Sequence, residues 1–285
     1  MEPVSQEQWK RRIRNYLPHL PGDLFKVLMM LVFVFPFYWM LITSFKTYNE
    51  SILVPPTLIP KVFTLEAYET VITKMNWFSY ALNSVLVTAG VIILQLLVMV
   101  PAAYSFAKHR FFGQGLFFSL VLIAFMIPGQ ITFITVYLTM ADWKLLSTLW
   151  PQILPFGANA FGIFMLRQAF KQIPNEVIES ARLDHASELQ IMTRILLPMS
   201  KSAMITIALF SFVGHWNSYF WPLVMTNTDM VRPLTIAIEK LKDVEYGLIW
   251  PNIMAGNVLL VLPVVVLYAF ASKKIIQAFA YRGMK

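Results

Sequence analysis

One charged stretch, residues 167–201, offers side chains for specific polar contacts, and it lies between two strongly apolar segments. It holds five basic and four acidic residues. A short helix fits residues 175–183, with Ile178 and Ala181 on one side and Glu179 on another. Such a helix is too small to bury a core of its own. The stretch therefore needs something to dock on. The alternative is a solvated amphipathic connector between two membrane spans, since charged loops are common on the inner face of a membrane.

Local signals define a helical hairpin in this stretch. Pro174 ends the preceding helix, because it lacks a backbone N–H and clashes with the turn before it. Residues 184–185 form the turn, and Ser187 caps a second helix with Gln190 three positions on to complete a capping box. We expect this second helix to end before Pro198.

A second group of polar and aromatic side chains falls inside the apolar segment at residues 202–228. Aromatic faces stack on sugar rings, and Asn and His side chains hydrogen-bond to hydroxyl groups, so this group suits a carbohydrate pathway. Packing between helices explains the same residues, and for Asn217 the two interpretations stand side by side. The group is His215, Trp216, Asn217 and Tyr219.

No catalytic or metal site is predicted. The four histidines are scattered over different segments, without metal-ligand spacing, and the chain has no cysteine. No Gly-x-x-x-x-Gly-Lys-[Ser/Thr] motif can be built, so we expect no ATP, metal or other cofactor to be bound by this chain itself.

The composition indicates a membrane protein. Of 285 residues 58% are hydrophobic and only 13% charged, against about 25% charged in soluble domains. Six uncharged windows are each long enough to cross a bilayer as a helix, which takes about 20 residues. These windows are residues 27–45, 75–107, 111–141, 145–166, 202–228 and 246–272.

The distribution of Lys and Arg predicts the orientation. With the N-terminus inside, 16 of the 23 basic residues lie on the cytoplasmic side and 7 outside. Both termini and residues 167–201 are therefore placed in the cytoplasm of a multi-pass inner-membrane protein. The net charge of +8 marks the inner face of a lipid bilayer, and no nucleic-acid partner is expected.

The windows predict a simple domain organisation. Pro128 and Gly129 should kink or interrupt the third window, and small residues such as Gly157 and Gly162 should allow close helix packing in the fourth. The predicted parts are a cytoplasmic arm (1–23), a first span (24–45), an external segment (46–79), a core (80–272) that contains the loop 167–201, and a cytoplasmic tail (273–285).

Three short motifs resemble the EAA loop of ABC-importer membrane subunits: ESA at 179–181, DHA at 184–186 and ILLP at 195–198. Ser180 stands where the family usually has Ala, and His185 where it usually has Gly. AAYSFAKHRFFGQ, IPGQITFI, LPFGANAFGIFMLRQAF and WNSYFWPL are similar to segments of the carbohydrate-importer branch, which includes subunits of maltose, glycerol phosphate and alginate oligosaccharide importers. The resemblance covers about two hundred residues from Asn83 onward.

The resemblance implies an all-α, six-span type I importer fold that translocates a sugar or oligosaccharide. It implies a second homologous membrane subunit, two cytoplasmic ATPases that bind ATP and Mg, and an extracytoplasmic solute-binding protein. The binding protein is expected to contact residues 226–251. The ATPase-docking residues would be Glu179, Ser180, Ala181, Asp184, His185 and Ala186, with Glu179 pairing with a basic or polar group and the small residues permitting close approach.

The candidate pathway residues are Asn83, Asn159, His215, Trp216, Asn217, Tyr219 and Asn257. His215, at a position that is often small in relatives, would favour an anionic substrate. An ion-coupled secondary transporter is the alternative function, but such proteins place Asp, Glu or His in their spans, and the six windows hold a single His. A structural membrane anchor would leave Asn217 and the kinked spans unexplained.

Overall fold

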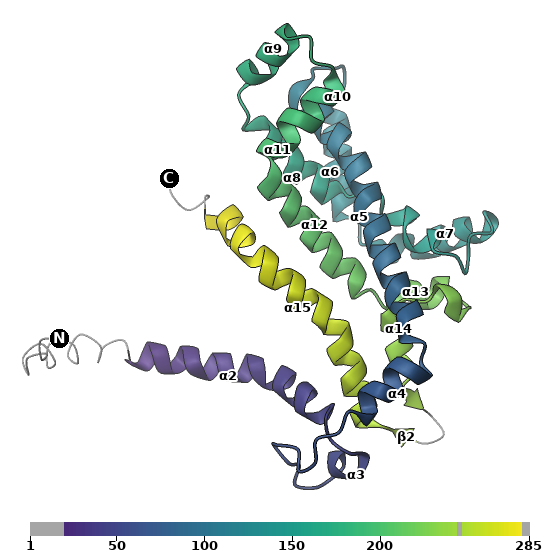
Figure 1. The fold of residues 1–285 in the computed structure, drawn as a ribbon. Helices are drawn as coiled ribbons and strands as arrows, with labels where there is room; N and C mark the ends of the chain where they lie inside the picture. Colours follow the sequence, from purple (N-terminus) through teal and green to yellow (C-terminus); the bar gives the residue numbers. More distant parts are fainter. Residues whose placement is uncertain (1–19, 244–246, 281–285) are drawn as a thin grey trace, which may run out of the picture. The chain divides into compact units, whose positions relative to one another are not determined.

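The computed structural model describes residues 20–243 and 247–280, and these are predominantly helical (Figure 1). Contacts divide the chain into two compact units, Met1–Val71 with Asp243–Val258, and Ile72–Lys242 with Leu259–Lys285. The prediction of an all-α fold is confirmed. Most of the predicted cytoplasmic arm, and residues 281–285 of the predicted tail, lie outside the described residues.

The first unit is built around one long apolar helix. This helix, α2, has Pro36 inside it and ends where a compact loop begins. A short helix, α4, lies within the predicted external segment. The elements of this unit, two of which continue into the other, are α2 (Leu20–Thr43), α3 (Tyr48–Ser51), α4 (Glu66–Lys74), β2 (Gly247–Leu248) and the start of α15 (Trp250–Ala280).

Two buried charges brace the loop after α2. The Lys46 Nζ donates to the carbonyl of Thr57 at 2.6 Å and lies 4.5 Å from the ring centre of Trp39. The Glu50 carboxylate accepts from the Thr57 hydroxyl and from the Lys61 N–H, both at 2.8 Å. Burial lowers the pKa of Lys46, and the Lys61 N–H lowers the pKa of Glu50. These contacts give a proline-rich loop a fixed shape without regular structure.

The second unit is a bundle in which α5 packs against α8 and α12. Its described elements in chain order are α5 (Trp77–Lys108), α6 (Gln114–Met126), α7 (Gly129–Asp142), 3₁₀ turns at Trp150–Gln152 and Leu154–Phe156, α8 (Ala160–Lys171), α9 (Asn175–Leu183), α10 (Glu188–Gln190), a π-helical segment (Ile191–Leu196), α11 (Leu197–Met199), α12 (Lys201–Trp216), α13 (Phe220–Met225), a 3₁₀ turn (Asp229–Val231), α14 (Leu234–Glu239), β1 (Lys242–Asp243) and the remainder of α15.

Glycines let these helices approach closely, as predicted. A Cβ at Gly162 of α8 would lie 2.0 Å from the Met99 Sδ of α5, and one at Gly157 would lie 2.6 Å from a methyl carbon of Leu94. Met99 and Leu166 are among the buried residues of the main core, which runs from α5 across α8 to the hairpin at 175–199.

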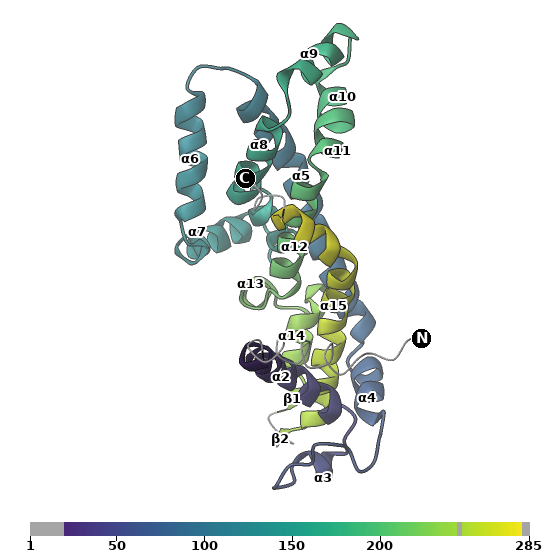
Figure 2. The ribbon, with the colours of Figure 1, turned by 90° about the vertical axis from the view of Figure 1, so that its left-hand side faces the viewer.

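Three helices in the described residues are long and apolar enough to cross a membrane, at Pro21–Thr43, Trp77–Lys108 and Trp250–Phe270. Two bent pairs bring the number to five if each counts as one span. The first pair, α6 and α7, turns by 96° at the predicted Pro128–Gly129 break, which Figure 2 shows from the side. A sixth crossing stays a prediction.

The fourth predicted span is not one continuous helix. Pro151 and Pro155 each remove a backbone donor, so the chain forms two 3₁₀ turns before α8 begins. The side chain of Asn159 then caps α8 by accepting from the Gly162 N–H at 3.0 Å. The fourth predicted window is therefore a broken segment that ends in α8.

Candidate functional site

The predicted docking helix is α9, and its bounds are those the sequence indicated, Asn175–Leu183. Its end is a Schellman turn, because the Ala186 N–H reaches the Ala181 carbonyl and the His185 N–H reaches the Arg182 carbonyl, both at 3.0 Å. Asp184 is the C-cap of α9, and the next residue, His185, takes the left-handed conformation with φ of 56°. This turn explains why the family usually has glycine where this chain has His185.

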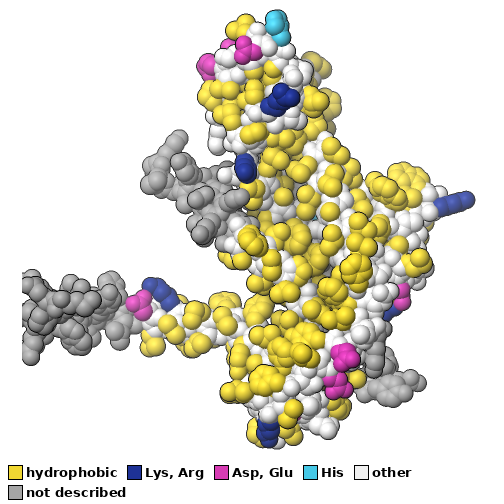
Figure 3. All heavy atoms as spheres, in the orientation of Figure 1, with side chains coloured by type: hydrophobic (Ala, Val, Ile, Leu, Met, Phe, Trp, Pro, Cys, Tyr) yellow, Lys and Arg dark blue, Asp and Glu magenta, His cyan; other side chains and the backbone are white. Residues whose placement is uncertain are grey.

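One face of α9 packs against the core of the chain, and the opposite face is exposed. Ile178 and Ala181 are buried in the main core, whereas Glu179, Ser180 and Asp184 are exposed. The small Ala181 packs against the core of its own chain, and its role in docking stays a prediction. In Figure 3 charged side chains gather at the end that carries α9, whereas hydrophobic ones cover α5 and α12.

The second helix of the hairpin begins as predicted but ends later. Ser187 and Gln190 form the capping box, with the Ser187 N–H donating to the Gln190 side chain at 2.8 Å. The expected end before Pro198 is wrong, because the helix continues to Met199. The wide π turn at Ile191–Leu196 precedes the proline and accommodates a residue that has no N–H to donate.

A polar cluster joins both hairpin helices to α5. The Tyr104 hydroxyl of α5 donates to Glu188 of α10, and Arg182 of α9 donates to the same carboxylate through Nε at 3.1 Å and Nη2 at 3.3 Å. His109, just past the end of α5, lies 3.5 Å from a Glu188 oxygen. Sequence reasoning missed this cluster, because its members are 84 positions apart and no local pattern pairs them.

Two further cations attach the same end of the bundle. The Lys108 Nζ donates to the Ile173 carbonyl at 2.6 Å and to the Asn175 side chain at 2.8 Å. The Arg167 guanidinium lies 3.8 Å from the ring centre of Phe118. Lys108 thus holds the base of the docking hairpin on α5, and Arg167 joins α8 to α6, while the tip of the hairpin is exposed.

At its other end α5 holds the outer loop. The buried Asn83 amide donates to the carbonyls of Met230 and Arg232 at 2.8 and 3.0 Å, and the Ser84 hydroxyl accepts from the Leu234 N–H at 2.8 Å. Both hydrogen atoms of the Asn83 amide are therefore engaged in holding the loop. Its role in a substrate pathway stays a prediction.

The other three asparagines among the candidate pathway residues form hydrogen bonds to neighbours close in the sequence. Asn159 caps α8, and the amides of Asn217 and Asn257 each donate to a carbonyl four residues earlier, at 2.9 and 2.8 Å. Asn257 belongs to the first unit, unlike the other candidate pathway residues.

His215 lines a cavity within the second unit. Its ring meets Phe156 edge-on at 4.7 Å between centres. Of its neighbours along the chain, Trp216 is buried and donates to the Leu260 carbonyl at 2.9 Å, whereas Tyr219 is 40% exposed and lies outside this cavity. Besides His215, the residues lining the cavity are Ser84, Val87, Gln152, Phe156, Ser218, Trp221, Pro222 and Pro233.

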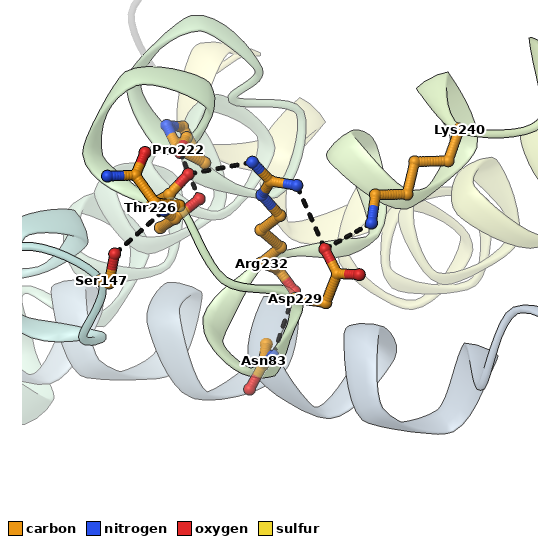
Figure 4. A network of polar contacts seen from close by, with 8 residues as sticks. Asn83, Ser147, Pro222, Thr226, Asp229, Arg232 and Lys240 are labelled. Carbon is orange, nitrogen blue, oxygen red and sulfur yellow. Dashed lines mark hydrogen bonds and ion pairs between the residues drawn. The ribbon is translucent and has the colours of Figure 1, made fainter.

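The outer loop carries its own ionic network (Figure 4). The Asp229 carboxylate accepts from Arg232 Nη1 at 3.1 Å and pairs with Lys240, and Arg232 Nη2 donates to the Thr226 carbonyl at 3.1 Å. The hydrogen bond from Lys240 lowers the pKa of Asp229 below its ordinary value of 3.8. The loop is therefore ordered by contacts within its own unit.

Known proteins share this arrangement. The family model described as "Binding-protein-dependent transport system inner membrane component" matches residues 99–280. A putative ABC transporter permease protein of Caldicellulosiruptor sp. is 32% identical over 88% of this chain and 91% of its own length. The arabinooligosaccharides transport system permease protein AraQ of Halalkalibacterium halodurans is 30% identical over the same shares.

A solved structure shares the fold. A chain of a bacterial ABC transporter involved in the import of the acidic polysaccharide alginate has a TM-score of 0.81 and 23% identity, covering 96% of this chain and 99% of that one. The predicted type I importer fold is thus confirmed, and the relatives favour an importer over the ion-coupled alternative. With its docking hairpin at one end of α5 and its outer loop at the other, the chain belongs to the family of binding-protein-dependent transport system inner membrane components.

Proposed function

We propose that this chain is a pathway-forming subunit of an ATP-driven importer for a sugar or oligosaccharide. The observation that carries the proposal is α9, a short helix whose buried side is fixed to the core while Glu179, Ser180 and Asp184 face outward. A rigid base and an exposed charged face are what a helix needs to receive force from a separate motor protein.

The relatives support the class of substrate. Their names specify arabinooligosaccharides, sn-glycerol-3-phosphate and, for a solved structure, the acidic polysaccharide alginate. The cavity lined by His215, Phe156 and Trp221 is too small in this structure to hold a sugar ring. Its imidazole and aromatic rings are nevertheless of the kinds that hydrogen-bond to and stack on carbohydrates. His215, which stands at a position that is often small in relatives, would favour an anionic sugar.

In the proposed assembly this chain has three kinds of protein partner. A second, homologous membrane subunit completes the pathway within the lipid bilayer. Two cytoplasmic ATPases bind ATP and Mg. One of them docks on the residues Glu179, Ser180, Ala181, Asp184, His185 and Ala186. A solute-binding protein docks on the outer loop at 226–251; a related alginate transporter has been solved with its periplasmic protein. Both termini of this chain lie in the cytoplasm.

Affinity isolation of the tagged chain in mild detergent tests the proposal. We expect an ATP-binding-cassette protein and a second multi-span chain to accompany it, and Glu179→Lys to lose the ATPase while the remaining assembly persists. Glu66→Lys is the matched control, because it reverses an exposed charge on α4 of the external segment. Isolation of the chain alone, or full ATPase recovery and transport with Glu179→Lys, would sink the assignment.

A further inference from the structure

The structure connects the docking hairpin to the outer loop through one continuous helix. At one end of α5, Asn83 and Ser84 hold the outer loop through three hydrogen bonds. At the other, Tyr104 holds the hairpin through Glu188. The twenty residues from Ser84 to Tyr104 span about 30 Å of helix at 1.5 Å per residue.

The Glu188 carboxylate accepts hydrogen bonds from two different helices, α5 and α9. Lys108 of α5 attaches the base of the hairpin, where the chain leaves α8, through the Ile173 carbonyl and the Asn175 side chain. Glu188 accepts hydrogen bonds from Arg182 of α9 and from Tyr104 of α5, so its carboxylate bridges the two helices. Direct contacts also join α9 to α5: Arg182 Nη2 lies 3.5 Å from the Tyr104 hydroxyl, and Lys108 donates to Asn175 at the start of α9. At the end of α9 that carries Arg182, a displacement therefore reaches α5 through the Glu188–Tyr104 contact, which the single hydroxyl of Tyr104 anchors.

The exposure of Glu188 and the burial of Tyr104 suit a contact that can transmit motion between helices and can also break. Its side chain is 50% exposed, so water and ions screen its pairing with Arg182. Tyr104 is 3% exposed and fixed in the main core, so the hydroxyl that holds Glu188 moves with α5. The screened Glu188 carboxylate, held by the buried Tyr104, therefore favours coupled motion of the hairpin and α5 and still allows the contact to break.

We propose that Glu188 is a positioning residue that transmits displacement of α9 to α5, and through Asn83 and Ser84 to the outer loop. This inference rests on the proposed function, since it assumes that an ATPase moves α9 and that a binding protein contacts the loop. Its consequence is that events at the outer loop alter ATP hydrolysis through the Tyr104–Glu188 contact.

The test uses the whole complex in lipid vesicles, with wild-type partner subunits and the binding protein. The variants are Glu188→Gln, Tyr104→Phe and the double substitution, with Arg194→Gln as the matched control. Arg194 is exposed on the same hairpin, and its side chain makes no hydrogen bond or ion pair within the described part of the chain. ATP hydrolysis is measured with and without the substrate-loaded binding protein, together with substrate uptake.

We expect basal hydrolysis to stay within about twofold of wild type in every variant. Stimulation by the binding protein should fall about tenfold in each single variant, as expected for loss of one charge-assisted hydrogen bond. The double variant should be no worse than either single one, because both remove the same contact. Arg194→Gln should keep full stimulation.

Equal losses of basal and stimulated hydrolysis would indicate a merely structural role and overturn the inference, as would unchanged stimulation in both single variants. Should Glu188→Gln fail to assemble, Tyr104→Phe decides alone, since it removes only a hydroxyl from a packed ring. A wild-type complex without ATP-driven uptake would instead overturn the proposed function, so the two failures are distinguishable.

Discussion

Gly162 of α8 faces Met99 of α5 so closely that a Cβ at position 162 would lie 2.0 Å from the methionine sulfur. Met99 is 1% exposed. We expect Gly162→Ala to destabilise the chain by about 1–3 kcal/mol, because the buried sulfur must move. Thermal unfolding in detergent measures the loss.

Gly214 supplies the control for this substitution. It lies in α12, and a Cβ built there meets nothing within 4 Å among the described residues. Gly214→Ala should therefore leave stability unchanged or raise it by about 0.4–1 kcal/mol. Equal melting temperatures for the two alanine variants would contradict the close approach of α8 to α5.

His185 carries a conformational cost at the end of α9. Its φ of 56° is one that side chains with a Cβ disfavour. We expect His185→Gly to stabilise the chain by about 0–1 kcal/mol, since relief of strain is partly offset by the entropy of glycine in the unfolded chain. His185→Val should cost about 1–2 kcal/mol.

The preceding residue gives the matched comparison. Asp184 has a φ of −79°, so Asp184→Gly relieves no strain and should cost about 0.5–1 kcal/mol. Chemical denaturation of all three variants measures these differences. A destabilising His185→Gly would show that the imidazole makes a contact worth more than the strain.

Asn83 should be essential to the order of the outer loop. Asn83→Leu keeps the size of the side chain but leaves the carbonyls of Met230 and Arg232 without their donor. The loss of each bond should weaken the attachment by about 1–3 kcal/mol. Hydrogen exchange of residues 226–241 should then speed up markedly.

Asn257→Leu is the control for the loop. Its amide bonds only to a carbonyl of its own helix in the described structure. Exchange in residues 226–241 should therefore match wild type in this variant. Unchanged exchange with Asn83→Leu would show that other contacts suffice to hold the loop.

The pairing of Asp229 predicts an acid-sensitive outer loop. Its carboxylate has a pKa lowered from 3.8 by Lys240 and Arg232. The stabilising contribution is therefore fully present above pH 3.8 and is lost as the pH falls through the lowered pKa. A fluorophore on Asn227→Cys, placed selectively because the chain has no other cysteine, should report a transition below about pH 4.

Asp229→Asn tests the assignment of that transition. The amide cannot titrate, so the labelled double variant should show no step in this pH range. A step that persists at the same pH would assign the transition to another group.

Local signals predicted the docking hairpin closely. Pro174 ends one helix, and Ser187 with Gln190 starts another, because these residues act on their immediate neighbours. The break at Pro128–Gly129 was predictable for the same reason, although its angle of 96° was not. The end at Pro198 was mispredicted, since a π turn is not encoded by any simple local pattern.

Long-range pairings could not be predicted from the sequence. Nothing near Asn83 indicates that its amide holds carbonyls about 150 residues later, and nothing near Tyr104 indicates Glu188. Polar residues in an apolar window suggest a wet pathway or a buried contact equally well. The structure identifies the hydrogen-bond partners of these residues, whereas their roles in transport await the experiments above.

The π-helical turn at Ile191–Leu196 sets the rotational phase between the two halves of its helix. Each residue of an α-helix advances the chain by about 100° around the axis. Removing one residue from the turn would therefore rotate Glu188 away from Tyr104 while Leu196 stayed in the core, with every side chain of the contact intact. The alignment of the hairpin with α5 is thus a matter of backbone residue count as much as of side-chain chemistry.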